Sequence, residues 1–274
     1  MEAALEHALL HAESGSRGEQ LAIWNGMARA ALAGPTPVEQ AIERCRKIGE
    51  EAPADRSLEA VLATISAYLE AMRGRFSVAR ELYASSQATL IELGKTVVLA
   101  ALQTWSGAAE LLAGDADAAE AELRAAFETL EPMGERANLA TNAAALGAAL
   151  HMQGRDDEAA ELTRLSERLA SHDDFTSQVE WRAVRAKLVA RQGQLGEAER
   201  LARESVSFAE QTDCPNLHGD ALLSLGETLA LAGQGTEACA AFAQAHDVYE
   251  AKGNTVLASV AAERNAAFAS ERAS

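Results

Sequence analysis

Glycine recurs in this chain at intervals of about forty residues, and this period constrains the fold more than any other feature. Three glycines, Gly94, Gly134 and Gly253, fall 20 residues after members of the longer series, so the period divides into halves. Glycine reaches the left-handed conformation that ends many helices without steric cost, so each half predicts a helix and a turn. The longer series, called here the repeat glycines, is spaced by 40, 40, 40, 39 and 40 residues and comprises Gly34, Gly74, Gly114, Gly154, Gly193 and Gly233.

The segments between the repeat glycines have the composition and periodicity of helices. Apolar residues recur at steps of three and four, for example Leu58, Val61, Leu62, Ile65 and Leu69. This spacing places them on one face of a helix. Alanine, leucine, glutamate, arginine and glutamine dominate, and all of them favour helix. Because no run of alternating β-branched residues is present, the sequence predicts antiparallel helix pairs.

Residues that can cap a helix stand near the start of most second helices. Residues 36–39 predict a capping box in the first repeat, with Pro37 at the first helical position. In later repeats, we expect the side chain three residues after the repeat glycine to accept hydrogen bonds from the first turn. These residues are Ser77, Asp117, Asp157 and Thr236.

Small residues also follow the period, and they predict where the two helices of a pair approach each other most closely. Seven residues before the repeat glycines stand Met27, Ala67, Gly107, Gly147, Ala186 and Gly226. Five residues after them, from the second repeat on, stand Ala79, Ala119, Ala159, Ala198 and Ala238. Small side chains let two helix backbones come close, while the leucines between them fill the remaining space.

The sequence therefore predicts an all-α fold, an α-solenoid with a right-handed superhelix, built from about six antiparallel helix pairs with unpaired terminal helices. We expect one domain over residues 1–274. Its repeats would span about 18–54, 56–95, 96–135, 136–175, 176–214 and 215–254, with a half repeat at 3–13 and a capping helix at 255–271. A start on half a repeat would also suit a fragment of a longer chain.

Two stretches resemble the signature of the tetratricopeptide repeat (TPR) superfamily, Leu-Gly followed by Gly-x-x-x-Glu-Ala. They are LGAALHMQGRDDEAAEL at 146–162 and LGETLALAGQGTEACAAF at 225–242. The family's usual period is about 34 residues. The longer period here is similar to the helical-repeat sensor regions of bacterial ATPase-containing transcriptional regulators and of cyclase–ATPase fusions. The resemblance implies a solenoid whose concave groove binds a partner.

Composition narrows the classes of partner and the compartment. The chain carries 24 Lys and Arg against 41 Asp and Glu, a net charge of −17. This charge repels phosphate backbones and anionic lipid, so direct nucleic-acid or membrane-surface binding is not expected. Three isolated cysteines suit a reducing cytoplasm. No stretch approaches the roughly 18 uninterrupted apolar residues that a membrane-spanning helix needs. We expect a cytoplasmic protein.

Motifs for catalysis or metal binding are missing from the sequence. It has no phosphate loop, no His-Glu-x-x-His and no Gly-x-Ser-x-Gly. His7 and His11 could face one metal, but two ligands on a terminal helix make a weak site. Residues 172–174, His-Asp-Asp, fall where a turn belongs. We therefore expect no metal, no cofactor and no enzymatic activity.

The TPR resemblance places the groove at positions thirteen, ten, six and three residues before each repeat glycine. The N-terminal half of these positions is apolar and aromatic, and the C-terminal half has an acidic bias. Core packing is the alternative reading for Trp24. Because Lys187 alone is basic at these positions, the family's way of holding a peptide C-terminus with Lys, Arg and Asn is not expected. The candidate partner-binding residues are Trp24, Thr64, Tyr68, Thr104, His151, Glu180, Lys187, Asp220 and Glu227.

The sequence thus favours a non-catalytic scaffold that binds a protein or peptide of basic and apolar character in its concave groove. The alternative is a ligand-sensing module of a larger bacterial signalling or transcriptional regulator, with a small molecule in the groove. A homodimer and the identity of the partner stay open.

Overall fold

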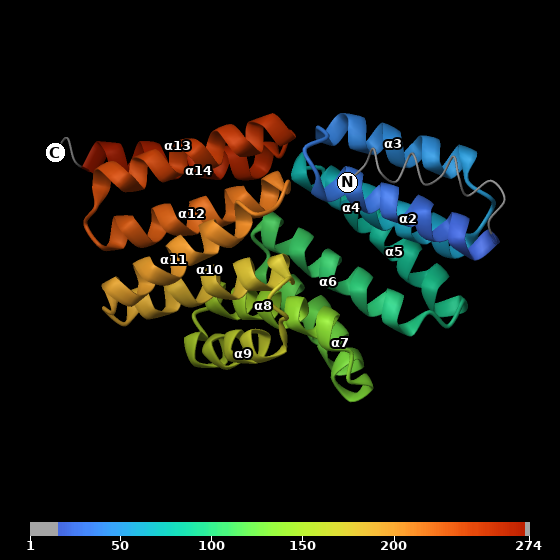
Figure 1. Cartoon of the computed structure of the whole chain (residues 1–274), viewed down its shortest axis with the longest axis horizontal. Coiled ribbons are helices and arrows are strands. Elements are labelled where there is room, and N and C mark those ends of the chain that lie inside the picture. Colours follow the sequence, from blue (N-terminus) through green and yellow to red (C-terminus); the bar gives the residue numbers. More distant parts are fainter. Residues whose placement is uncertain (1–15, 272–274) are drawn as a thin grey trace.

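A computed structural model describes residues 16–271, which form thirteen α-helices and no strand. The helices follow one another along the chain with short turns between them (Figure 1). The structure confirms the predicted all-α solenoid of antiparallel helix pairs. The predicted half repeat at 3–13 lies outside the described residues. The helices are α2 (Arg17–Ala33), α3 (Val38–Glu51), α4 (Arg56–Met72), α5 (Phe76–Glu92), α6 (Thr96–Ala113), α7 (Ala116–Met133), α8 (Arg136–Met152), α9 (Asp156–Leu169), α10 (Phe175–Arg191), α11 (Leu195–Ala209), α12 (Pro215–Leu231), α13 (Gly235–Lys252) and α14 (Thr255–Glu271).

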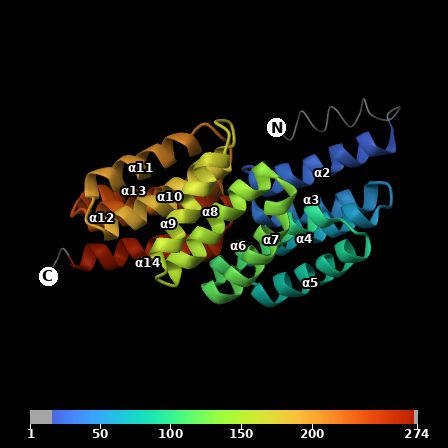
Figure 2. The same ribbon diagram turned by 90° about the horizontal axis from the view of Figure 1, so that it is seen from below.

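The even-numbered helices form the inner layer of the array, and the odd-numbered helices form the outer layer (Figures 1 and 2). From α2 to α12, each even-numbered helix packs on the odd-numbered helix that follows it. Even-numbered helices also pack on one another, from α2 on α4 through to α10 on α12. Neighbouring odd-numbered helices make no comparable contact within the described range. Helices that are closer on one side than on the other curve the array, so the even-numbered helices line its concave face.

The glycine turns confirm the local prediction at all but one position. Eight glycines have a positive φ, among them Gly114, Gly134 and Gly253, which end their helices in the left-handed conformation. Gly34 departs from the prediction, since it has φ −76° and ψ −174°. The residue after it is Pro35, and the ring of a proline pushes the preceding residue into extended conformations.

The predicted helix caps are wrong in register. Helices α5, α7, α9 and α13 begin one residue before the expected side chains, so Ser77, Asp117, Asp157 and Thr236 lie inside the first turn. In α7 the cap is Asp115, which accepts from the N–H of Ala118 at 3.0 Å. The cap residue of α3 is Pro37, one residue after the Thr36 that the predicted box would place there. A capping box forms at the start of α2, between Ser16 and Glu19.

The periodic small residues lie buried between paired helices, as predicted. Ala119, Ala159, Ala198 and Ala238 are fully buried. A Cβ atom added to Gly226 of α12 would lie 2.5 Å from the Phe242 ring of α13. The close approach of the two helices therefore depends on the missing side chain.

We expect the same glycine-to-alanine change to have opposite effects at two helical positions. At Gly196 of α11 an added Cβ meets nothing within 4 Å, so Gly196→Ala should stabilise the protein by up to about 1 kcal/mol through helix propensity. Gly226→Ala gains the same propensity but pushes on the Phe242 ring, and overpacking of this kind costs about 1–3 kcal/mol. Urea unfolding of the two variants measures the difference. Equal stabilisation by both would show that the Phe242 ring yields at little cost.

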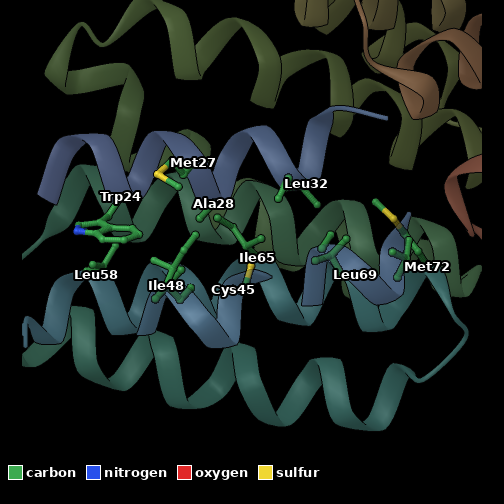
Figure 3. Packing of buried hydrophobic residues seen from close by; sticks show 14 residues of the cluster. Trp24, Met27, Ala28, Leu32, Cys45, Ile48, Leu58, Ile65, Leu69 and Met72 are labelled. Carbon is green, nitrogen blue, oxygen red and sulfur yellow. The ribbon is translucent and has the colours of Figure 1, made fainter. Parts of the chain in front are cut away.

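The first two repeats enclose the largest apolar cluster (Figure 3). Trp24 and Met27 of α2 pack there with Ile48 of α3 and with Leu58 and Ile65 of α4.

Helix α6 is by length and composition apolar enough to cross a membrane, with a mean hydropathy of 1.2 over 18 residues. It packs on helices α4, α5, α7 and α8, its Glu110 pairs with Arg80 of α5 at 2.5 Å, and about a third of its residues are buried in the array.

The last repeat closes onto the first two, which the sequence did not predict (Figure 1). Lys252, the final residue of α13, is fully buried. Its ammonium donates to the carbonyl oxygens of Ala31, Gly34 and Thr36, around the turn between α2 and α3, at 2.7–3.0 Å. The hydroxyl of Thr255 reaches the Met72 carbonyl at 3.4 Å. We call this contact the seam.

Candidate functional site

The nine predicted groove residues fall into two groups in the structure. Five of them are partly exposed and lie on the inner helices: Tyr68, Glu180, Lys187, Asp220 and Glu227. The other four are at most 9% exposed: Trp24, Thr64, Thr104 and His151. The second group is available to a partner only in small part.

The side chains of the buried group contact other parts of the same chain. These contacts explain their burial without a binding partner. Trp24 is 7% exposed and packs in the first apolar cluster, in keeping with the core-packing alternative (Figure 3). Thr104 accepts from the side-chain amide of Asn142 at 3.0 Å. The Nδ1 atom of His151 lies 2.8 Å from an Asp156 carboxylate oxygen. Burial lowers the pKa of His151, although Asp156 opposes this shift. Partner binding by these residues stays a prediction.

Four side chains from three repeats interact electrostatically, and we call them the inner cluster. They are Tyr68 of α4, Glu180 of α10, Asp220 of α12 and Tyr249 of α13. The Tyr249 hydroxyl donates to Asp220 at 2.5 Å. The Oε2 atom of Glu180 is buried and has no hydrogen-bond partner in the described range. Two of the four are carboxyl groups, and the charge of Lys187 acts on Asp220.

Burial raises the pKa of both acids in the inner cluster. Burial raises the pKa of Glu180 to about 8, and the charges of Asp220 and Asp174 add to the shift. Burial also raises the pKa of Asp220 to about 6, although the Tyr249 hydroxyl and the charge of Lys187 oppose it. The pKa of Tyr68 is raised by burial and by both carboxylates. A cation placed in the cluster would oppose these shifts.

The remaining predicted charges already have partners. Lys187 of α10 and Glu227 of α12 form an ion pair at 3.6 Å. Glu227 also pairs with Arg264 of α14 at 3.5 Å. Glu227 is therefore less available to a partner than Glu180, although both belong to the same predicted acidic bias.

An aromatic residue that the groove positions missed extends the inner cluster. The rings of Tyr68 and Trp105 meet edge to face, with centroids 5.1 Å apart at 72°. Trp105 of α6 is 37% exposed, the most exposed of the three tryptophans. It lies nine residues before Gly114, one residue away from the groove position at Thr104. Exposed aromatics of this kind supply much of the binding energy in protein interfaces.

Next to Trp105, a cavity of about 450 Å³ opens among the inner helices of the first three repeats. We call it the N-terminal cavity. Its wall includes the groove positions Leu21, Val61, Thr64 and Ala101, as well as the indole of Trp105. Two basic residues, Arg29 of α2 and Lys95 before α6, also line it. The sequence reasoning missed both, because neither occupies one of the four groove positions.

Comparison with known proteins supports the fold on independent grounds. No family model and no curated protein matches the sequence. The structure is similar to that of a Rap protein in complex with Competence and Sporulation Factor, with 14% identity and a TM-score of 0.61 over 93% of this chain and 76% of the other. It is also similar to the apo form of the quorum sensor NprR from B. thuringiensis, with 12% identity and a TM-score of 0.54 over 93% and 79% of the two chains. The fold is that of a TPR-like solenoid. A third similar structure is BtubC from P. vanneervenii, with 16% identity and a TM-score of 0.54 over 78% and 89% of the two chains.

No group of three or more potential ligands in the described part of this TPR-like solenoid is arranged to hold a metal ion. His7 and His11 lie outside the described residues. Asp173 accepts from the Ser171 hydroxyl at 2.6 Å, and Asp174 caps α10. Burial raises the pKa of the Cys45 thiol to about 11, which disfavours the reactive thiolate.

Proposed function

We propose that this TPR-like solenoid is a non-catalytic scaffold that binds a peptide, or a peptide-like segment of a protein, on its concave face. The observation that carries the proposal is the inner cluster, where the buried Oε2 atom of Glu180 has no hydrogen-bond partner in the described range and interacts electrostatically with Asp220 and with Tyr68, whose ring packs on Trp105. The guest is therefore basic and apolar: its cation pairs with the carboxylate of Asp220 and favours the ionised form of Glu180, and its apolar part packs on Tyr68 and Trp105.

The similar structures support a regulatory role. One of them is a complex with Competence and Sporulation Factor, and another is described as a quorum sensor. Both cover more than nine-tenths of this chain. The inner cluster would be the place at which this solenoid binds a signal peptide.

The test is binding of the amidated peptide acetyl-Arg-Leu-Arg-Leu to the full chain by isothermal titration calorimetry. We expect Glu180→Gln combined with Asp220→Asn to weaken binding at pH 8 by about tenfold or more, because both counter-charges of the guest are lost. The matched control is Glu128→Gln with Asp213→Asn, which removes the same charge from exposed positions outside the cluster. If the control variant loses as much affinity for the peptide, the overall charge of the chain explains the effect, and the proposal is contradicted.

A small-molecule sensor is the second candidate, and the N-terminal cavity favours it. Its volume of about 450 Å³ lies within the usual range of about 300–1,000 Å³ for small-molecule sites. A thermal-shift screen of metabolites tests this candidate, because a ligand that binds the folded state alone raises the melting temperature.

A further inference from the structure

The seam and the inner cluster lie one helical turn apart on the same helices. Helix α4 supplies Tyr68 to the inner cluster and Met72 to the seam, where the Met72 carbonyl accepts from Thr255 at 3.4 Å. Helix α13 supplies Tyr249 to the inner cluster and Lys252 to the seam. Residues three or four apart are neighbours on one face of a helix, so the two sets of contacts form adjacent layers.

Helix α12 takes part in both layers. In the inner cluster, its Asp220 accepts from the Tyr249 hydroxyl at 2.5 Å. Four residues earlier, the Nδ2 atom of Asn216 lies 3.6 Å from the Met72 sulfur, and its Oδ1 atom accepts from Asn254 at 3.0 Å. Asn216 and Met72 are 144 positions apart in the sequence. Their contact therefore exists only while the last repeats meet the first two.

The inner cluster itself also spans this closure. Tyr68 belongs to the second repeat, whereas Glu180 lies in the fifth repeat and Asp220 in the sixth. Tyr68 interacts electrostatically with both carboxyl groups. Opening the array at the seam would take α4 away from α12 and α13, so it would separate the layer of the inner cluster together with the layer of the seam.

Glu180 lacks a hydrogen-bond donor in the closed array. Its Oε2 atom is buried and has no hydrogen-bond partner in the described range. A carboxylate held there is costly, because neither water nor a donor stabilises its charge, and a protonated carboxyl costs less. In keeping with this geometry, burial raises the pKa of Glu180 to about 8. Its ionised form is better accommodated where water reaches it, which favours an open array.

The groups that face Glu180 do not supply a counter-charge. Asp220 of α12 and Asp174 at the cap of α10 both raise its pKa, and Tyr68 of α4 also faces it. Lys187 acts on Asp220 instead. Helices α8, α9 and α11 pack on α10 as well, but the ion pairs near these contacts involve other residues. These pairs are Arg185 with Glu167, Arg182 with Glu204, and Arg191 with Asp156, which also contacts His151 of α8.

We propose that the inner cluster and the seam form one pH-sensitive latch, which is closed while Glu180 is protonated and opens when Glu180 ionises. The latch goes beyond the proposed function, because it concerns the shape of the chain itself and requires no guest. The closed array retains a proton that the open array releases. Closure is therefore favoured at low pH and weakens as the pH rises from about 4.5 to about 8, the ordinary and the closed-state pKa of Glu180.

The amine of Lys252 reports directly on the seam, because it is fully buried in the closed array. The full chain is treated briefly with the N-hydroxysuccinimide ester of acetic acid between pH 6.5 and pH 9.5, and acetylation of each lysine is measured by mass spectrometry. Lys47 is the internal reference, since its side chain is 55% exposed and exposed lysine amines ionise alike. We expect the ratio of the acetylation rates of Lys252 and Lys47 to rise about tenfold between pH 6.5 and pH 8.5.

A variant and a second measurement assign this rise to Glu180 and to the shape of the array. Glu180→Gln keeps the size of the side chain but cannot ionise, so the ratio should no longer depend on pH. The matched control is Glu128→Gln, which removes a charge from an exposed position of α7 and should preserve the rise. In the unmodified chain, the maximum dimension from small-angle X-ray scattering should increase over the same pH range.

Three outcomes would overturn the latch. The ratio and the maximum dimension of the unmodified chain could stay constant with pH, or the rise could survive Glu180→Gln. Amide hydrogen exchange, corrected for its intrinsic pH dependence, could rise equally in α7 and α8, which would mean that the whole chain loosens. Failure of the basic peptide to bind would contradict the proposed function alone, because these measurements contain no peptide.

Discussion

Lys252→Met should destabilise the protein by about 3 kcal/mol, because it removes the donor from two buried carbonyl oxygens and one partly buried carbonyl oxygen at once. The ammonium of Lys252 donates to Ala31, Gly34 and Thr36, and its side chain is fully buried. Methionine retains the apolar stem and spares the cost of burying an amine, which offsets part of the loss. The offset is incomplete, since a buried carbonyl left without a donor costs about 1–3 kcal/mol.

The same variant should also change the shape of the array. If the seam holds the first and last repeats together, Lys252→Met increases the maximum dimension measured by small-angle X-ray scattering. Amide hydrogen exchange should rise at the turn between α2 and α3. Lys47→Met is the matched control, because Lys47 is 55% exposed and its partner Glu43 lies 3.8 Å away. It should leave stability within about 0.5 kcal/mol. Unchanged stability and dimensions in Lys252→Met would show that the seam contributes little to the closed form.

The features that the sequence predicted correctly are local and repeated. A glycine ends a helix through its own backbone, so Gly114 or Gly253 can be interpreted from its position alone. The exception at Gly34 also has a local cause, the proline that follows it. The predicted cap positions are wrong by one residue. Residue type alone does not distinguish a serine at the cap from a serine such as Ser77 at the second helical position.

The features that the sequence did not predict depend on contacts between distant repeats. Lys252 is a single lysine at the end of a helix, where it would ordinarily be exposed, and nothing in the period connects it with Ala31. Arg29 and Lys95 reach the N-terminal cavity from outside the four expected groove positions. Curvature decides which side chains face one another, and curvature follows from how closely the inner helices pack along the whole array.

Glu180→Gln should stabilise the protein increasingly as the pH rises. The carboxyl of Glu180 has a pKa of about 8 in the folded state against an ordinary value of 4.5. The folded chain therefore holds this proton over a range in which the unfolded chain has lost it, and stability falls as the pH rises from about 4.5 to about 8. Glutamine does not titrate, so this part of the loss disappears in the variant.

The expected gain of the variant over the unmodified chain grows by about 2–4 kcal/mol between pH 5 and pH 8. The slope against pH is the informative measurement, because any fixed cost of the new amide is the same at every pH. Urea unfolding at several pH values measures it. Glu227→Gln is the control, since it breaks the ion pairs with Lys187 and Arg264 and should destabilise the protein at pH 8. A flat difference between Glu180→Gln and the unmodified chain would mean that Glu180 is ionised in the folded protein at neutral pH. The inner cluster would then lack the uncompensated acid on which the basic guest depends.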